Sequence, residues 1–271
     1  MQQRPVFLVL IDISGYTRFT KLHRLSAMHA EQIVSDLLES IIQRASFPLV
    51  VHEILGDSVN FFAFAEDGRA VALEVRRQVA AIFDAFRLRE GELISDCSLC
   101  ICQACMNVGK LHLKAVLHYG QAIFTEVAGF RKIAGEDVIV AHRLLKNSVP
   151  EKEYVIESEP FYQLAGRPAG ANPEARTEHY EDLGDVRIRV SYPGEKRAAP
   201  SGTRRSLISK LRMSLRNDVY YLKRLFSQSA RDFQHIGQSV DQSFDAPALS
   251  QTALFAAKTH LPAPPPKSSN P

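Results

Sequence analysis

The 271 residues of this chain, 45% of them hydrophobic, suffice for one full core and an appendage but not for two large domains. No apolar run is long enough to cross a bilayer, and Met1–Leu10 lacks the features of a signal peptide, so the sequence predicts a cytoplasmic protein. Residues 1–195 hold 21 Lys and Arg against 26 Asp and Glu, whereas residues 196–271 hold 12 against 4. This asymmetry predicts an acidic domain with a basic tail and argues against a core that binds specific nucleic acid.

The first half of the domain alternates between β-rich runs and helical spacing. An apolar run at 6–12 predicts a buried strand, and apolar residues at helical spacing predict a helix from Ser26 to Gln43. Two β-rich runs at 49–55 and 58–65 are separated only by Gly56 and Asp57, which predicts a tight hairpin.

The second half also contains both helices and strands. We expect a helix at 69–89, a cysteine-rich loop, two strands at 111–118 and 121–127 with a tight turn at Gly120, and a helix at 136–147. Further strands are expected at 153–157 and 186–192. The resulting β-α-β-β-α-β order predicts an α+β fold with a ferredoxin-like palm.

Two aspartates follow predicted strands. Asp12 ends the first strand and Asp57 lies at the tip of the hairpin. Carboxylates at neighbouring strand ends can converge on a divalent cation, which prefers oxygen ligands. An aspartate at a hairpin tip is also common turn chemistry, so the pair alone leaves both interpretations open.

Four segments, in this order, resemble the motifs of class III adenylyl and guanylyl cyclases. They are DISGYT at 12–17, EILGD at 53–57, LHYGQA at 117–122 and GEDVIVAHR at 135–143. The resemblance covers most of 6–192, and it is close to a bacterial cyclase-like family of unknown function that carries a similar cysteine-rich loop. It implies the cyclase palm fold for residues 1–195.

The resemblance also implies a metal-dependent site that two chains share. Asp12 and Asp57, helped by the main-chain carbonyl of Ile13, would bind two Mg²⁺ or Mn²⁺ ions. Arg143 matches the family's catalytic arginine, which acts across a homodimer interface on a nucleoside triphosphate.

Base recognition would fall to Glu53 and Lys132. A carboxylate and an ammonium complement the edge of guanine, which favours GTP. The same two groups could instead pair with each other, and Lys132 could be a solvated loop lysine.

Two positions depart from the family pattern. Ile139 stands where the family has the asparagine that orients the ribose, and isoleucine forms no side-chain hydrogen bond. The triphosphate lysine of many cyclases is replaced at Leu183-Gly184; Arg187 or Arg189 could compensate, or could form the polar face of a strand. A catalytically degenerate module that binds nucleotide or metal is therefore the alternative to an active cyclase.

Four cysteines gather within nine residues: Cys97, Cys100, Cys102 and Cys105. Four thiols this close can bind Zn²⁺ or an iron–sulfur cluster, form reversible disulfides, or remain unligated. The spacing favours metal.

The tail contains one helical candidate before a Pro-rich, disordered end. Apolar residues between 206 and 226 fall on one helix face, with basic residues around it. Such a helix could pack on its own domain, on a second copy or on a partner protein, or it could lie on an anionic membrane surface.

Overall fold

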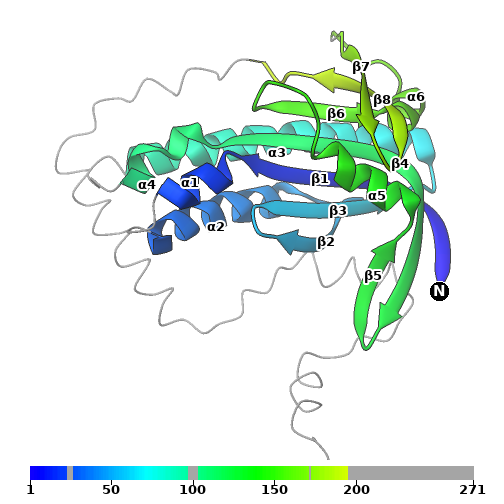
Figure 1. Cartoon of the computed structure of the whole chain (residues 1–271), viewed down its shortest axis with the longest axis horizontal. Helices are drawn as coiled ribbons and strands as arrows, with labels where there is room; N and C mark the ends of the chain where they lie inside the picture. The colour runs from blue at the N-terminus through cyan, green and yellow to red at the C-terminus, as the bar shows by residue number, and fades with distance from the viewer. Residues whose placement is uncertain (23–26, 97–102, 171, 195–271) are drawn as a thin grey trace, which may run out of the picture. The chain divides into compact units, whose positions relative to one another are not determined.

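The computed structural model describes residues 1–22, 27–96, 103–170 and 172–194, which form one mixed sheet of eight strands with helices on both faces (Figure 1). The predicted tail helix at 206–226 and three of the four cysteines lie outside the described residues. The α+β palm predicted from the sequence is confirmed.

The centre of the sheet is β1 (Gln2–Ser14), which runs antiparallel to both of its neighbours. These neighbours are β3 (Ser58–Phe64) and β4 (His112–Val127). Side chains of β1 from Val6 to Ile11 are at most 5% exposed, which explains why this stretch is apolar without alternation. The predicted buried strand is therefore correct, although it is longer than expected.

The other strands extend the sheet in both directions. The order is β2-β3-β1-β4-β6-β8-β7, and β5 pairs with β4 off this path. Only β4 and β6 run parallel; the remaining pairs are antiparallel. These outer strands are β2 (Val50–Leu55), β5 (Phe130–Ala134), β6 (Tyr154–Ser158), β7 (Glu174–Tyr180) and β8 (Gly184–Ser191).

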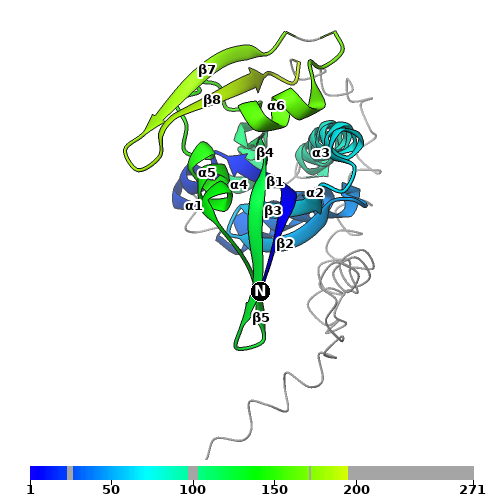
Figure 2. The ribbon, with the colours of Figure 1, turned by 90° about the vertical axis from the view of Figure 1, so that its right-hand side faces the viewer.

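The long helices divide between the two faces of the sheet. α2 (Ala27–Arg44) and α3 (Gly68–Asp96) pack on each other and on β3, whereas α5 (Glu136–Leu144) packs on β4 and β1. Figure 2 shows α3 and α5 on opposite sides of β4. The short helices are α1 (Tyr16–Leu22), α4 (Gln103–Met106), the 3₁₀ turn Val108–Lys110 and α6 (Glu159–Ala165).

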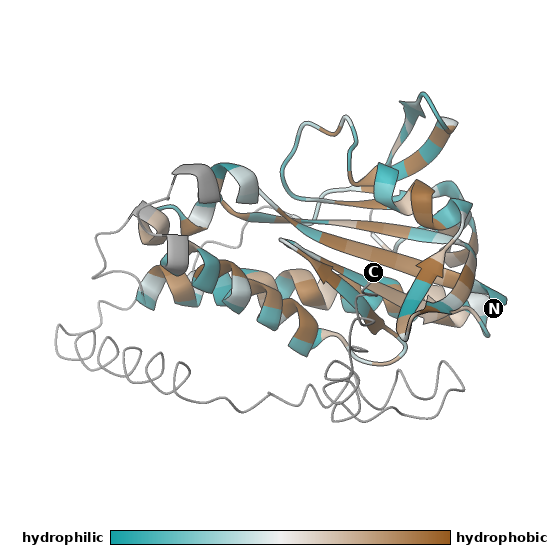
Figure 3. Ribbon diagram, turned by 60° about the horizontal axis from the view of Figure 1, so that its bottom comes forward, coloured by the Kyte–Doolittle hydropathy of each residue, from teal (hydrophilic) through white to brown (hydrophobic). Residues whose placement is uncertain are grey.

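Hydropathy follows this layering. Figure 3 shows apolar residues along the central strands, while α2 carries hydrophilic residues on one side and hydrophobic residues on the other. The inward side of α2 includes Ile33, Leu37 and Ile41, each at most 2% exposed. Burial of this stripe is the main force that holds the helix on the sheet.

The predicted tight turn at Gly120 is wrong. Gly120 lies inside the continuous strand β4, and the chain reverses later, where Ala128 and Gly129 both have positive φ. A Cβ added at Gly120 would come within 2.1 Å of the carboxyl carbon of Asp137. The glycine is therefore needed for the close approach of α5 and not for a turn.

A buried ion pair ties α3 to the far half of the sheet. Arg76 of α3 contacts both carboxylate oxygens of Glu157 on β6, at 2.7 and 2.8 Å, and donates to the carbonyl of Gly166 at 2.8 Å. Glu157 is only 2% exposed, so the ion pair with Arg76 offsets the cost of burying its charge in the core.

We expect Arg76→Met to lower the free energy of unfolding by about 3 kcal/mol, because it leaves the charge of Glu157 buried without compensation. Chemical denaturation measures this change. Arg77→Met is the matched control: its pair with Glu74 is exposed, and its midpoint should stay that of the unaltered protein. Equal losses in the two variants would contradict this account.

Candidate functional site

The structure brings Asp12 and Asp57 together at the end of β1. In the register of the sheet, Asp12 lies opposite Ser58, the residue that follows Asp57. The main-chain N–H of Ile13 donates to the carbonyl of Asp57 at 3.1 Å, which fixes the hairpin tip beside β1. The side chain of Ile13 is fully buried, so only its main chain faces the pair.

The two carboxylates repel each other. Partial burial, followed by the negative charge of Asp12, raises the pKa of Asp57 from its ordinary 3.8 to about 6. A hydrogen bond from its own backbone and the charge of Lys114 act in the opposite direction, but more weakly. A cation bound between the carboxylates would relieve this repulsion.

Lys114 is the residue of this site that sequence reasoning missed. It lies directly opposite Asp12 on β4, and its Nζ is 2.9 Å from Oδ2 of Asp12. The same ammonium donates to the carbonyl of Leu145, at the end of α5, at 3.3 Å. The sequence shows Lys114 only as a lysine in a predicted strand. Its pairing with Asp12 could not be predicted, because it depends on the register between β1 and β4.

The donor set fits a hard cation that keeps water or substrate ligands. Within the described ranges, no group of three or more His, Cys, Asp and Glu side chains is placed to hold a metal ion. Asp12 and Asp57 would thus supply two carboxylates, with main chain, water or phosphate completing the shell. Mg²⁺ is commonly bound in this manner.

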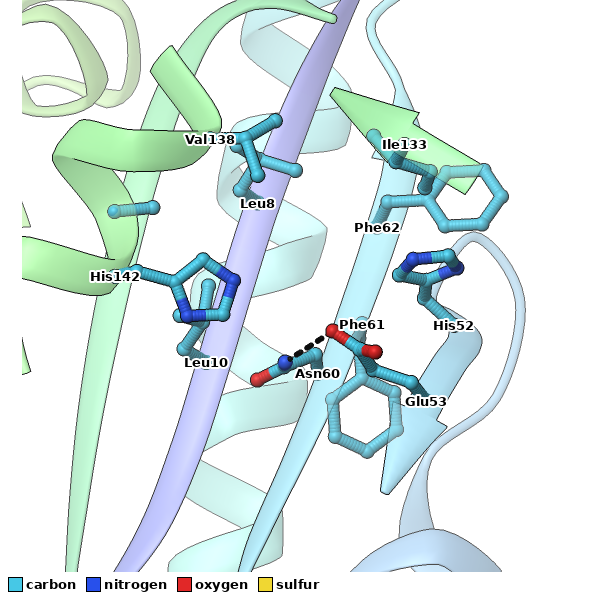
Figure 4. A pocket seen from close by; sticks show the side chains of 11 residues that line it. Leu8, Leu10, His52, Glu53, Asn60, Phe61, Phe62, Ile133, Val138 and His142 are labelled. Atoms are coloured by element: carbon cyan, nitrogen blue, oxygen red, sulfur yellow. Dashed lines mark hydrogen bonds between the residues drawn. The ribbon is translucent and has the colours of Figure 1, made fainter. Parts of the chain in front are cut away.

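A small, partly open cavity lies on the same face of the sheet, under α5. Along β1, Leu8 and Leu10 line it, four and two residues before Asp12, so strand alternation places all three on one face. Figure 4 shows the walls that the sheet, β5 and α5 provide. The remaining lining residues are His52, Glu53, Asn60, Phe61, Phe62, Ile133, Val138, Ala141 and His142.

The polar groups of the cavity come from β2, β3 and α5. Asn60 donates from Nδ2 to Oε1 of Glu53 at 3.0 Å, as the dashed line in Figure 4 marks. Asn60 is 4% exposed, and its Oδ1 finds no hydrogen-bond partner in the part of the chain that the structure describes. The cavity therefore offers hydrogen-bond acceptors from Asn60 and Glu53.

Two imidazoles flank these acceptors. Burial lowers the pKa of His52, and the nearby His142 lowers it further, while Glu53 acts in the opposite sense. His52 is therefore mainly neutral at pH 7. Because His142 belongs to α5 and His52 to β2, the cavity lies between these two elements.

Lys132 does not line the cavity with Glu53. It is exposed on β5 opposite Thr125, and the next residue, Ile133, faces the cavity. Side chains alternate along a strand, so Lys132 points to the other face. Its role in base recognition stays a prediction.

Two other predicted positions lie on the outer side of α5. Arg143 is 45% exposed and forms an ion pair with Asp182, in the turn between β7 and β8. Ile139 is 51% exposed, one helical turn before it. Both are presented to solvent, where a second chain could meet them.

Hydrogen bonds fix the start of α5. Asp137 accepts from the main-chain N–H of Gln121 at 2.6 Å, and its other oxygen lies 2.9 Å from Nε2 of His118. The contact with His118 is the largest of the effects that lower the pKa of Asp137. Nδ1 of His118 lies 2.8 Å from the hydroxyl of Ser158, so β4 and β6 position α5 together.

The structure describes only one of the four predicted metal-binding cysteines. Cys105 is buried in α4, and its Sγ lies 3.6 and 3.7 Å from the ring nitrogens of His29 on α2. Because Cys97, Cys100 and Cys102 lie outside the described residues, Zn²⁺ or an iron–sulfur cluster stays a prediction.

The arginines considered as substitutes for the triphosphate lysine lie elsewhere. Arg189 of β8 pairs with Glu159 at 3.2 Å and lies over the ring of Tyr162. Arg187 is exposed on the same strand. Since β4 and β6 separate β8 from β1, neither lies on the strands that carry the aspartate pair.

Comparison with known sequences finds a family and a relative. The family described as "Protein of unknown function (DUF2652)" matches residues 34–154. "Uncharacterized protein Rv2561/Rv2562" of Mycobacterium tuberculosis is 28% identical over 153 residues, which cover 56% of this chain and 70% of that protein.

Comparison with solved structures identifies the fold. The guanylyl cyclase Cya2 superposes with a TM-score of 0.53 at 16% identity, covering 72% of this chain and 95% of Cya2. The adenylyl cyclase CyaB from P. aeruginosa gives 0.54 at 14% identity, covering 70% and 95%. This chain has the class III nucleotidyl cyclase fold.

A third cyclase gives a similar match. The guanylate cyclase domain of RhGC from Catenaria anguillulae, solved in complex with GTP, gives a TM-score of 0.50 at 14% identity, covering 71% of this chain and 99% of that domain. These identities establish the fold alone. Among the described residues of the cyclase-like chain, no helix is both long and apolar enough to cross a membrane.

In metal-free protein, Asp57 should make stability fall with rising pH. Its folded-state pKa of about 6 exceeds its ordinary 3.8, so the folded state binds the extra proton between these values, and the stability this provides is lost as the pH rises through 6. Asp57→Asn removes the loss. We expect it to gain about 1 kcal/mol over the unaltered protein between pH 4 and 7.5, a figure reduced for partial exposure.

Denaturation midpoints in the presence of a chelator, measured across this pH range, provide the test. Asp84→Asn, which alters an exposed carboxylate, is the control and should show no such pH-dependent gain. The proposed repulsion would be refuted if the stability of Asp57→Asn differed from that of the unaltered protein by the same amount at pH 4 and at pH 7.5.

Proposed function

We propose that this chain is a homodimeric, metal-dependent nucleotidyl cyclase that converts a nucleoside triphosphate, GTP by preference, into a cyclic nucleotide and pyrophosphate. The observation that carries the proposal is the convergence of Asp12 and Asp57 at the end of β1, on a cyclase fold and on the same sheet face as the cavity at Glu53.

The chemistry assigns a task to each residue. The 3′-hydroxyl oxygen bonds to the α-phosphorus, the bond from that phosphorus to the pyrophosphate oxygen breaks, and the hydroxyl proton passes to water. Asp12 and Asp57 would hold Mg²⁺ or Mn²⁺, which supplies positive charge for the phosphates. Arg143 would stabilise the charge that develops on the transferred phosphate.

The distribution of exposed residues supports a shared site between two chains. Arg143 and Ile139 face solvent on α5, while Asp12 and Asp57 lie at the end of β1. Large apolar side chains are also exposed at two hairpin tips: Ile54 and Leu55 next to Asp57, and Val127 and Phe130 beyond the opposite end of β1. Exposed apolar groups of this kind favour an interface with a second copy.

The preference for GTP is supported by the acceptors in the cavity. Guanine carries donors at N1 and N2, and both the carboxylate of Glu53 and the unpaired Oδ1 of Asn60 can accept them. This argument does not depend on Lys132, which lies on the other face of β5.

The second candidate is a cyclase-fold module that binds nucleotide without turnover. Ile139 favours it, because an isoleucine cannot hold the ribose and the in-line geometry depends on such positioning. Binding would still use Asp57 and Glu53, so the two candidates differ in product formation and not in affinity.

Incubating the full-length chain with Mn²⁺ and each of the four nucleoside triphosphates, and measuring cyclic product by mass spectrometry, tests the proposal. We expect cyclic GMP as the main product. Asp57→Asn should reduce its formation more than about 100-fold, because the cation loses a ligand, and Arg143→Ala should reduce it by about 100-fold. Asp84→Asn should be unaffected.

Calorimetry on the same proteins separates the candidates. Saturable binding of GTP without any cyclic product supports the module, and folded protein that neither binds nor converts any nucleotide rules out both.

Restoring the family's asparagine provides a second test. We expect Ile139→Asn to raise the rate of cyclisation about tenfold, since the new amide can orient the ribose. The position is half exposed, so the polar side chain costs little in stability. Ile139→Ala removes the same apolar surface without adding an amide and should give no gain; equal rates in the two variants would show that ribose positioning does not limit turnover.

A further inference from the structure

The ammonium of Lys114 occupies a fixed place beside the aspartate pair. Its Nζ lies 2.9 Å from Oδ2 of Asp12 and 3.3 Å from the carbonyl of Leu145, and its side chain is 19% exposed. The charge also acts on Asp57. The positive charge of Lys114 thus offsets part of the negative charge that would attract a cation to this site.

The sheet leaves this lysine little freedom. Lys114 and Asp12 are direct cross-strand partners, so both side chains emerge on the same face of β4 and β1. The carbonyl of Leu145 follows the last residue of α5, where the helix dipole is negative and favours a cation. An oxygen from strand β1 and an oxygen from the end of α5 therefore hold the ammonium from different directions.

The charges at the site match one divalent ion better than two. Asp12 and Asp57 together carry two negative charges when ionised, and the ammonium already balances part of this. One divalent ion brings the sum to +1, whereas two ions would bring it to +3 within a partly buried space, and repulsion between close like charges is strong there. Lys114 and a second ion would compete for Asp12.

We propose that Lys114 takes the place of one of the two metal ions, so that the site of this chain binds a single divalent cation at Asp12 and Asp57. This inference rests on the metal site of the proposed function, but not on turnover. The inference predicts that Lys114 lowers the affinity of the site for a metal ion and limits the number of bound ions to one.

Titration of the full-length chain with Mn²⁺ alone, followed by calorimetry and by the electron paramagnetic resonance of free Mn²⁺, tests the proposal. The double variant Asp12→Asn/Asp57→Asn gives the background of ions bound elsewhere. Above that background, we expect one Mn²⁺ per unaltered chain. Lys114→Met should bind the first ion at least tenfold more tightly and take up a second.

Three further variants keep the result interpretable. Lys114→Arg retains the charge and should behave like the unaltered chain, whereas Lys114→Gln removes it with a polar side chain and should behave like Lys114→Met even where the latter folds poorly. Lys146→Met alters an exposed lysine near the end of α5 and should change nothing. Circular dichroism verifies that each variant is folded.

The outcomes separate this inference from the proposed function. Two Mn²⁺ ions per unaltered chain, or unchanged binding in both Lys114→Met and Lys114→Gln, would overturn the role of Lys114 while leaving a metal-dependent cyclase intact. No Mn²⁺ above background in any of the proteins would overturn both. Binding by Lys114→Met alone would also overturn the inference, because the unaltered chain would then bind no ion at its aspartate pair.

Discussion

The register of three antiparallel strands determines the rest of the site. β1 pairs with β3 and β4 so that Asp12 lies between Ser58 and Lys114, and the hairpin tip with Asp57 follows from the same alignment. A shift of one residue in either pair would send Asp12 or its neighbours to the opposite face. The run from Val6 to Ile11 resists such a shift, because it is buried on both faces of the sheet.

α5 connects this row of charges to the outer surface. Asp137 and His118 fix its start, and Lys114 reaches the carbonyl of Leu145 at its end. Between them, His142 faces the cavity, while Ile139 and Arg143 face solvent. One short helix thus carries a wall of the cavity and the groups available to a second chain, which is why its close contact at Gly120 matters.

The sequence predicts those features that depend on local pattern. The buried run of β1, the helical stripe of α2 and the hairpin at Gly56 are all present, because burial and turn chemistry act over a few residues. Gly120 was misjudged, since a glycine that makes room for Asp137 is indistinguishable in sequence from one that turns the chain. Lys114 and the face of Lys132 depend on strand register, which no local pattern contains.

The central claim is that a divalent ion at Asp12 and Asp57 binds the triphosphate whose base enters the cavity at Glu53. Crystals grown with Mn²⁺ and 3′-deoxy-GTP, which lacks the attacking hydroxyl, test it through the anomalous signal of manganese. The account predicts that signal between the two aspartates, with guanine against Glu53 and Asn60. Manganese found only away from these aspartates, or a nucleotide bound outside this face of the sheet, would contradict it.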